Sequence, residues 1–130
     1  MPELATLMAD PAQILVVEDE ETIREVLVTA LQDEGYAVRD VGDGQRALDV
    51  LGAWTPNLII LDLMLPVLDG WDFLRESQRL GLADKVPVVV LSASRRGITV
   101  TETFPACAAV IAKPFDLGSL LDTIERLVRS

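Results

Sequence analysis

The sequence predicts an α/β fold in which an open, doubly wound parallel sheet is covered by helices on both faces. One observation is a series of short, almost wholly apolar runs, such as "QILVV" and "VPVVVL", which are typical of strands buried on both faces. The other is that segments with apolar residues at helical spacing separate these runs. Parallel strands joined by right-handed helical crossovers produce this architecture.

Five strands and five helices are expected in alternation. The strands are expected at 13–17, 36–41, 57–61, 86–91 and 109–112. The helices are expected at 21–35, 44–54, 70–80, 95–106 and 116–128. The fourth of these helices is a poor candidate, because Gly97 and Thr99 have low helix propensity and Pro105 restricts Phe104.

Residues with known capping preferences mark the helix ends. Gly35 is the expected stop of the first helix, and Pro56 separates the second from the next strand. We interpret Asp69 as a turn or capping residue and Asp116 as the N-cap of the last helix. The apolar helix residues expected to face the core are Ile23, Val26, Leu27, Ala30, Leu31, Ala47, Leu48, Leu51, Phe73, Leu74, Leu80, Leu117, Leu120, Leu121, Ile124 and Val128.

Composition indicates one compact domain, since half of the 130 residues are hydrophobic. We divide the chain into a lead over 1–12, which has little periodicity, and a domain over 13–130. With 21 acidic and 11 basic residues, the net charge is −10. This charge repels nucleic acid and anionic membranes, so direct nucleic-acid binding is disfavoured and cations or basic partner surfaces are favoured.

The cysteine and histidine content excludes several kinds of site. Cys107 is the only cysteine and there is no histidine, which excludes an internal disulfide, most zinc sites and phosphohistidine on this chain. A lone thiol suits a reducing compartment. The first residues lack a secretory signal, and no apolar run approaches the ~20 residues that span a bilayer. We therefore expect a cytoplasmic protein without a membrane segment.

Polar side chains follow four of the five expected strands. Glu18 and Asp19 follow the first, Asp62 the third, Ser92 the fourth and Lys113 the fifth. Helix starts favour Asp, Glu and Ser, so any one of these residues alone would fit an ordinary surface loop. Ligands of doubly wound sheets bind at the carboxyl ends of the strands. Five polar residues at that edge together indicate a functional site.

Three carboxylates at one edge require a cation. Two unit charges ~4 Å apart interact by about 4 kcal/mol at an effective dielectric near 20, so without a cation one carboxyl should retain its proton more tightly. Mg²⁺, or Mn²⁺ as the alternative, prefers carboxylate, water and phosphate oxygens and is the expected cofactor. Lys113 could then share the charge of a phosphoryl group, Ser92 could donate a hydrogen bond to it, and Asp62 could be the attacking carboxylate.

The ordered set "VVEDE", "LDLMLPVLDGW", "LSAS" and "AKPFDL" resembles the receiver domain of two-component response regulators over residues 13–129. A single motif of this kind would be weak, but the complete set in order is specific. The resemblance implies a flavodoxin-like (βα)5 fold with strand order 2-1-3-4-5, a receiver domain over 13–130, and a signalling protein rather than an enzyme beyond its own phosphorylation and autodephosphorylation. It also implies a Lys113–Pro114 bond that is often cis.

The resemblance assigns a role to each polar residue of the site. Asp62 accepts a phosphoryl group from a histidine kinase or phosphotransfer protein, and Ser92 and Lys113 contact that group. The metal ligands implied by the resemblance are Glu18, Asp19, Asp62 and the backbone carbonyl of Met64. Phosphorylation is expected to switch an output surface around residues 92–113, which a downstream protein partner reads.

The sequence departs from the family pattern at Val110, where relatives commonly have a rotating Tyr or Phe. We interpret Val110 as a core residue and expect a monomer or weak dimer, because the neighbouring helix is also weak. The phosphodonor is expected to dock on the first helix, at Glu21, Arg24, Glu25 and Val28, although a simple solvated helix face is an equal alternative. We favour a stand-alone signalling protein, with a phosphorelay intermediate or a fragment of a DNA-binding regulator or hybrid kinase as alternatives.

Three other functions compete with the receiver hypothesis. A haloacid-dehalogenase-like, magnesium-dependent phosphatase also uses an Asp nucleophile, but it needs a second Asp where Met64 stands. A flavin or nucleotide binder needs a glycine- or hydroxyl-rich first loop, and "EDEE" would repel phosphate instead. A degenerate receiver that only binds partners would not need all five polar residues.

Overall fold

The computed structural model describes residues 11–82, 85–93 and 103–129, and within them it shows a five-stranded parallel sheet with the order β2-β1-β3-β4-β5. The strands are β1 (Gln13–Val17), β2 (Ala37–Val41), β3 (Leu58–Asp62), β4 (Val88–Ser92) and β5 (Cys107–Ala112). Every neighbouring pair is parallel. The predicted fold class and strand order are confirmed.

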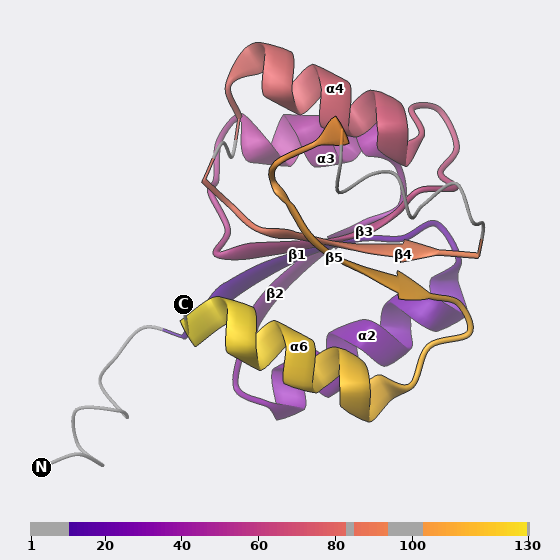
Figure 1. Cartoon of the computed structure of the whole chain (residues 1–130), viewed down its shortest axis with the longest axis vertical. Coiled ribbons are helices and arrows are strands. Elements are labelled where there is room, and N and C mark those ends of the chain that lie inside the picture. The colour runs from indigo at the N-terminus through magenta and orange to yellow at the C-terminus, as the bar shows by residue number, and fades with distance from the viewer. Residues whose placement is uncertain (1–10, 83–84, 94–102, 130) are drawn as a thin grey trace, which may run out of the picture.

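Four helices cover the sheet in the described part of the chain. They are α2 (Glu21–Asp33), α3 (Gly44–Leu51), α4 (Gly70–Leu80) and α6 (Leu117–Arg129). Figure 1 shows α3 and α4 on one face of the sheet and α2 and α6 on the other. Residues 95–102 of the helix expected at 95–106, and most of the lead expected at 1–12, lie outside the described residues. None of the described helices has the length and apolar character needed to cross a membrane.

The sheet separates two apolar layers, because successive strand residues point to opposite faces. Leu15, Val17, Ile59 and Leu61 belong to the cluster beneath α3 and α4, which also contains Phe73. The intervening strand residues pack against α2 and α6. That second cluster contains Ile14, Val16, Leu58, Ile60, Leu27, Leu31, Leu120 and Ile124.

Side chains and glycines terminate the helices largely as expected. Asp69 Oδ1 accepts a hydrogen bond of 2.9 Å from Asp72 N, and Asp116 Oδ2 accepts one of 2.9 Å from Ser119 N. Both predicted capping roles are confirmed. Gly35 follows α2 with a φ of 93°, a left-handed conformation that glycine adopts without a Cβ clash.

Two residues expected in the core are exposed, and β4 and β5 begin two residues away from their predicted starts, whereas the bounds of β2 and β3 differ by one residue. Val26 is 47% and Leu80 49% exposed, because Val26 lies at the edge of its stripe and Leu80 ends α4. β4 runs from Val88 to Ser92 rather than over 86–91, since Pro87 has no N–H to donate to the sheet. β5 begins earlier than expected, at Cys107, and a register shift accompanies it.

Candidate functional site

The carboxyl ends of four adjacent strands bring the predicted polar residues to one edge of the sheet. Glu18 directly follows β1, Asp62 and Ser92 end β3 and β4, and Lys113 directly follows β5. Lys113 N donates to Ser92 O at 2.9 Å, so the backbone of β5 is tied to the end of β4. Glu18, Asp62 and Ser92 are all at most 3% exposed. These residues were separate in sequence, and the sheet order unites them.

Lys113 forms a buried ion-pair network with two of the carboxylates. Its Nζ lies 2.7 Å from Glu18 Oε1 and 3.1 Å from Asp62 Oδ2. The Lys113 side chain is 16% exposed, and those of Glu18 and Asp62 are 1% and 5% exposed. A single ammonium therefore compensates two largely desolvated carboxylates, and charge-assisted hydrogen bonds of this kind are among the strongest in proteins.

Glu18, Asp19 and Asp62 form a cluster of oxygen donors that suits a hard cation. One carboxylate oxygen from each residue lies within 4.8 Å of the others. Glu18 and Asp62 are buried, whereas Asp19 is exposed. All three donors are carboxylates, the ligand type that Mg²⁺ prefers. The donor set thus fits the expected magnesium ion, and the exposed side of the cluster at Asp19 leaves room for water ligands.

Charge and burial shift the pKa values of this cluster. The pKa of Glu18 is raised to about 7, because burial, together with the hydrogen bond and charge of Asp62, outweighs the lowering by Lys113. Burial lowers the pKa of Lys113, but hydrogen bonds and charges from Glu18 and Asp62 outweigh that effect, so its pKa is raised. The raised pKa of Glu18 agrees with the expectation that one carboxyl holds its proton more tightly when no cation is bound.

Met64 contributes its backbone to the site. Its N–H donates a hydrogen bond of 3.0 Å to Asp62 Oδ1, while its side chain is 69% exposed. Asp62 therefore has one oxygen held by a backbone N–H and the other by Lys113. The carboxylate plane is fixed by groups on two different segments.

Arg24 is a site residue whose position the sequence did not reveal. Its Nη1 donates to Glu18 O at 2.9 Å, and its Nε lies 3.1 Å from Asp40 Oδ2. The guanidinium thus holds the loop after β1. Of the residues expected to bind the phosphodonor, Glu21 and Glu25 are exposed on α2 and Val28 is half-buried. The sequence contained one indication of this role, since Arg24 is the only basic residue among the acidic residues at the start of α2.

The loop between β3 and α4 packs closely against the end of β3. A Cβ built on Gly70 would lie 2.6 Å from Leu63 Cα and 2.9 Å from Asp62 O, so only glycine fits there. Gly70 N also donates to Leu63 O at 3.0 Å. Farther along the loop, Val67 has a φ of 66°, and Leu68 N donates to Pro66 O at 2.7 Å across it. This is a γ-turn, a strained conformation for a β-branched residue.

A family model for the response regulator receiver domain matches residues 14–125. The chain belongs to this family. It is 36% identical over 123 residues to the response regulator MprA of Mycolicibacterium vanbaalenii, covering 92% of this chain and 51% of that protein. It is 38% identical over 123 residues to the transcriptional regulatory protein CseB of Streptomyces coelicolor, covering 94% and 51%. The chain therefore spans about half the length of the curated relatives it matches.

Solved structures agree with the family assignment. The receiver domain of the sensor histidine kinase PA1611 from Pseudomonas aeruginosa superposes with a TM-score of 0.81 at 30% identity, covering 92% of this chain and 99% of that one. That structure has a magnesium ion coordinated in its active site cleft. Members of the receiver family are signalling domains that interact with histidine kinases, rather than typical enzymes.

Two further expectations from the sequence concern β5 and the bond that follows it. The Lys113–Pro114 peptide bond is cis. Val110, which replaces the common aromatic residue, is half-buried and packs against the cluster beneath α3 and α4, so its interpretation as a core residue is confirmed. The surface expected to carry the output, around residues 92–113, lies only in part within the described residues.

Proposed function

We propose that this receiver domain accepts a phosphoryl group on Asp62 from a histidine kinase or phosphotransfer protein and that the transfer requires Mg²⁺. The observation that carries the proposal is the Lys113 ammonium, which lies 3.1 Å from Asp62 Oδ2 in a buried site beside two further carboxylates. Burial of a carboxylate costs free energy unless a nearby positive charge and hydrogen bonds compensate its negative charge. A fixed, desolvated Asp beside a cation is an arrangement suited to covalent catalysis.

In the proposed reaction, a carboxylate oxygen of Asp62 attacks the phosphorus atom of the donor. The new bond joins that oxygen to phosphorus, and the bond between phosphorus and the donor's histidine nitrogen breaks, leaving its electron pair on the imidazole. Lys113 and the Ser92 hydroxyl provide positive charge and a hydrogen bond for the phosphoryl oxygens. The Met64 N–H, which is 3.0 Å from Asp62 Oδ1, orients the carboxylate during attack.

Glu18, Asp19, Asp62 and the carbonyl of Met64 are the residues that would hold the metal ion. A bound Mg²⁺ would neutralise part of the negative charge that gathers when phosphate approaches three carboxylates. The clustering of the carboxylate oxygens within 4.8 Å supports this assignment, as does the magnesium ion in the PA1611 receiver domain. Glu18 must release its proton to bind the ion directly, or bind it through a water molecule.

Phosphorylation would change the charge on residue 62 from −1 to roughly −2 and add acceptor oxygens. Ser92 and Lys113 can respond together, because Lys113 N is bonded to Ser92 O. We infer that this paired movement reaches the surface around residues 92–113, which would then bind a downstream protein. Val110 has no ring to rotate, so the signal does not use the common aromatic switch. Hydrolysis of the acyl phosphate by the domain itself would end the signal.

The biological setting follows from the same proposal. We place the domain at residues 13–130, in the cytoplasm, where histidine kinases deliver phosphate, and we favour a stand-alone messenger that does not contact nucleic acid. CseB is a transcriptional regulatory protein about twice the length matched here. A receiver within a longer transcriptional regulator or hybrid kinase is therefore the alternative, and the two share the chemistry at Asp62.

Incubation with acetyl phosphate and Mg²⁺ followed by intact-mass measurement tests the proposal. The wild type is expected to gain the mass of one phosphoryl group, and Asp62→Asn is expected to gain none. Wild-type protein in EDTA serves as the metal control and should remain unmodified. An equal yield of adduct on Asp62→Asn would show that the acceptor has been misassigned.

A further inference from the structure

The first residue of α3 touches the loop that follows Asp62. Gly44 is buried, and a Cβ built on it would overlap the carbonyl oxygen of Leu68 and lie 3.0 Å from its carbonyl carbon. Such a Cβ would also lie 3.1 Å from Leu68 Cβ. The obstructing atoms belong mainly to the backbone and cannot rotate away as the end of a side chain could. Any side chain at position 44 must displace either α3 or the loop.

The start of α3 is held in place by its own contacts. Asp43 Oδ1 caps the helix by accepting a hydrogen bond of 2.8 Å from Arg46 N. One turn later, Ala47 and Leu48 are buried in the apolar cluster beneath α3 and α4. Figure 1 shows α3 and α4 side by side over the same face of the sheet. Moving α3 would disturb this close-packed layer, so the loop is the part that must yield.

The loop has little freedom to yield without moving Met64. On its far side, Gly70 already sits against Leu63 and Asp62 O with no space for a Cβ. Leu68 N is bonded to Pro66 O at 2.7 Å, and the intervening turn is strained. Glycines at the starts of two helices therefore allow close contacts at two points of this segment, Gly44 with Leu68 and Gly70 with Leu63 and Asp62 O. A shift of Leu68 would be transmitted through this short, stiff segment to Met64.

We propose that Gly44 is a positioning residue for phosphorylation of Asp62. The missing side chain sets the separation between α3 and the loop, and that separation fixes the Met64 backbone. Met64 N holds Asp62 Oδ1 at 3.0 Å, and its carbonyl is the proposed metal ligand. This inference rests on the proposed function and adds to it a residue from a helix that carries none of the polar site residues.

Alanine substitutions at the two ends of α3 test the inference. Gly44→Ala introduces the obstructing Cβ. Gly52→Ala is the matched control, because a Cβ there would make only ordinary contacts, at 3.4 Å with Asp49 O and 3.7 Å with Leu48 O, in a right-handed conformation. Calorimetry measures the Mg²⁺ affinity, and intact mass measures the rate of phosphorylation by acetyl phosphate. Gly44→Ala is expected to lower both by about tenfold, the scale seen for residues that orient ligands, whereas Gly52→Ala should leave both within about twofold.

Measurements of stability and of amide signals distinguish a positioning role of Gly44 from general structural damage by the substitution. Alanine favours helix more than glycine does, so a simple helix effect would stabilise both variants. In nuclear magnetic resonance spectra, the Met64 and Leu68 amide signals are expected to shift in Gly44→Ala but not in Gly52→Ala. If Gly44→Ala does not fold, the double variant Gly44→Ala/Val67→Gly gives the loop a more adaptable turn. Its Mg²⁺ affinity should still be reduced by about tenfold.

Two outcomes would overturn the inference in distinguishable ways. If wild type, Gly52→Ala and folded Gly44→Ala bind Mg²⁺ and react equally, Gly44 does not position the site, while the proposed function stands. Wild-type affinity in the folded double variant would likewise exclude a positioning role for Gly44. If the wild type itself is not phosphorylated, the proposed function fails and the role of Gly44 fails with it.

Discussion

Lys113 Nζ lies 2.7 Å from Glu18 Oε1, an ion pair between residues 95 positions apart in the chain. The same Nζ also contacts Asp62 Oδ2 at 3.1 Å. These contacts join the ends of β5, β1 and β3 across the edge of the sheet. The proposed phosphorylation site is therefore held together by the groups that would perform its chemistry, and its stability and its activity are coupled.

Removing Lys113 should destabilise the metal-free protein. Lys113→Ala leaves two buried carboxylates without a cation, and we expect the free energy of unfolding in EDTA to fall by about 3 kcal/mol at pH 8. Urea unfolding measures this change. Added Mg²⁺ should restore part of the stability by replacing the lost positive charge, while phosphorylation by acetyl phosphate should remain strongly reduced.

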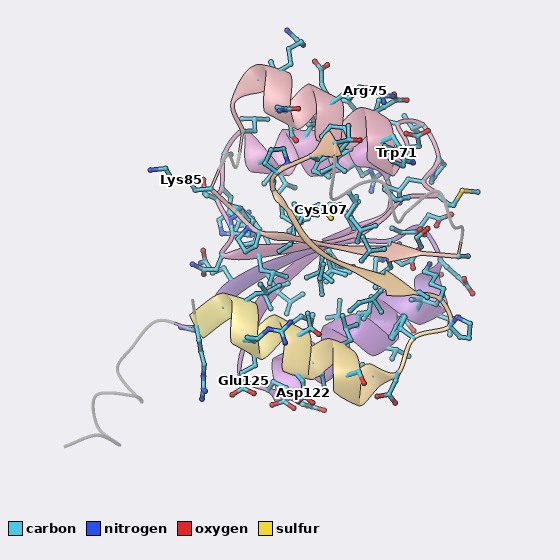
Figure 2. All side chains as sticks on the ribbon, viewed as in Figure 1. Trp71, Arg75, Lys85, Cys107, Asp122 and Glu125 are labelled. Carbon is cyan, nitrogen blue, oxygen red and sulfur yellow. The ribbon has the colours of Figure 1, made fainter. Side chains whose placement is uncertain are left out.

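Lys85 provides the matched control, since it is the only other lysine and is exposed. Figure 2 places Lys85 at the edge of the sheet opposite the carboxyl ends of β4 and β5. Lys85→Ala should change the free energy of unfolding by no more than about 0.5 kcal/mol. Equal effects of the two substitutions would contradict the role assigned to the buried network.

The raised pKa of Glu18 predicts an unusual pH dependence without metal. Its pKa rises from 4.5 in the unfolded chain to about 7 in the folded protein, so between these values the folded state binds a proton that the unfolded state has released. The stabilising contribution of this proton is complete below about pH 4.5 and is lost as pH rises through 7. In EDTA, deprotonation of Glu18 should therefore lower the free energy of unfolding by up to about 3 kcal/mol as pH rises from 4.5 to above 7.

Glu18→Gln isolates this contribution, because glutamine imitates the protonated side chain and does not titrate. The two proteins should have similar stability at low pH, and Glu18→Gln should become the more stable one, by up to about 3 kcal/mol, as pH rises to 7.5. Mg²⁺ affinity of the wild type should increase over the same range, since the ion competes with the proton. Parallel stability curves for the two proteins would show that Glu18 does not titrate in this window.

Val67 should be a site where glycine stabilises the protein. Its φ of 66° costs a β-branched residue about 1–3 kcal/mol, and its side chain is 84% exposed, so little packing is lost on truncation. After the entropic cost of glycine, Val67→Gly is expected to raise the free energy of unfolding by about 1 kcal/mol. Val67→Ala retains the Cβ and should gain much less. A destabilised glycine variant in urea titrations would argue against strain at this turn.

Cys107 should be unreactive in the folded protein. The residue is 6% exposed, and burial raises the pKa of its thiol to about 11. Figure 2 shows Cys107 between the sheet and the α3–α4 layer. Labelling with a disulfide reagent at pH 8 should therefore be slow in buffer and become rapid in denaturant. Stoichiometric labelling of the native protein within seconds would be inconsistent with this burial.

The sequence predicted the sheet well, and it located polar residues that meet at one edge of the sheet, because both depend on patterns that are local. Apolar runs identified four of the five strands and alternation identified β2, and the residues after the four apolar runs include Glu18, Asp62, Ser92 and Lys113. Strand order then determined that they would meet. Boundaries were less accurate, as at β4 and β5, because pairing with neighbours rather than local composition decides where a strand begins.

Long-range packing was the part that the sequence did not reveal. Arg24 looked like a surface residue on an acidic helix, yet it contacts Glu18 O and Asp40 across the end of β2. Gly44 looked like an ordinary helix start, yet it touches the backbone of Leu68. The raised pKa of Glu18 depends mainly on burial, and the composition of the chain does not show which carboxyl is the most buried. The Arg24–Asp40 and Gly44–Leu68 contacts join different elements of the fold, which local sequence patterns do not reveal.

The central claim is that Asp62 becomes an acyl phosphate in the presence of Mg²⁺, and locating that group in the chain tests it most directly. Borohydride reduces an aspartyl phosphate to homoserine, which peptide sequencing by mass spectrometry can assign to one residue. After treatment with acetyl phosphate and Mg²⁺, homoserine is expected at position 62, and the EDTA control should contain none. Homoserine at another acidic residue, or its absence in both samples, would contradict the account.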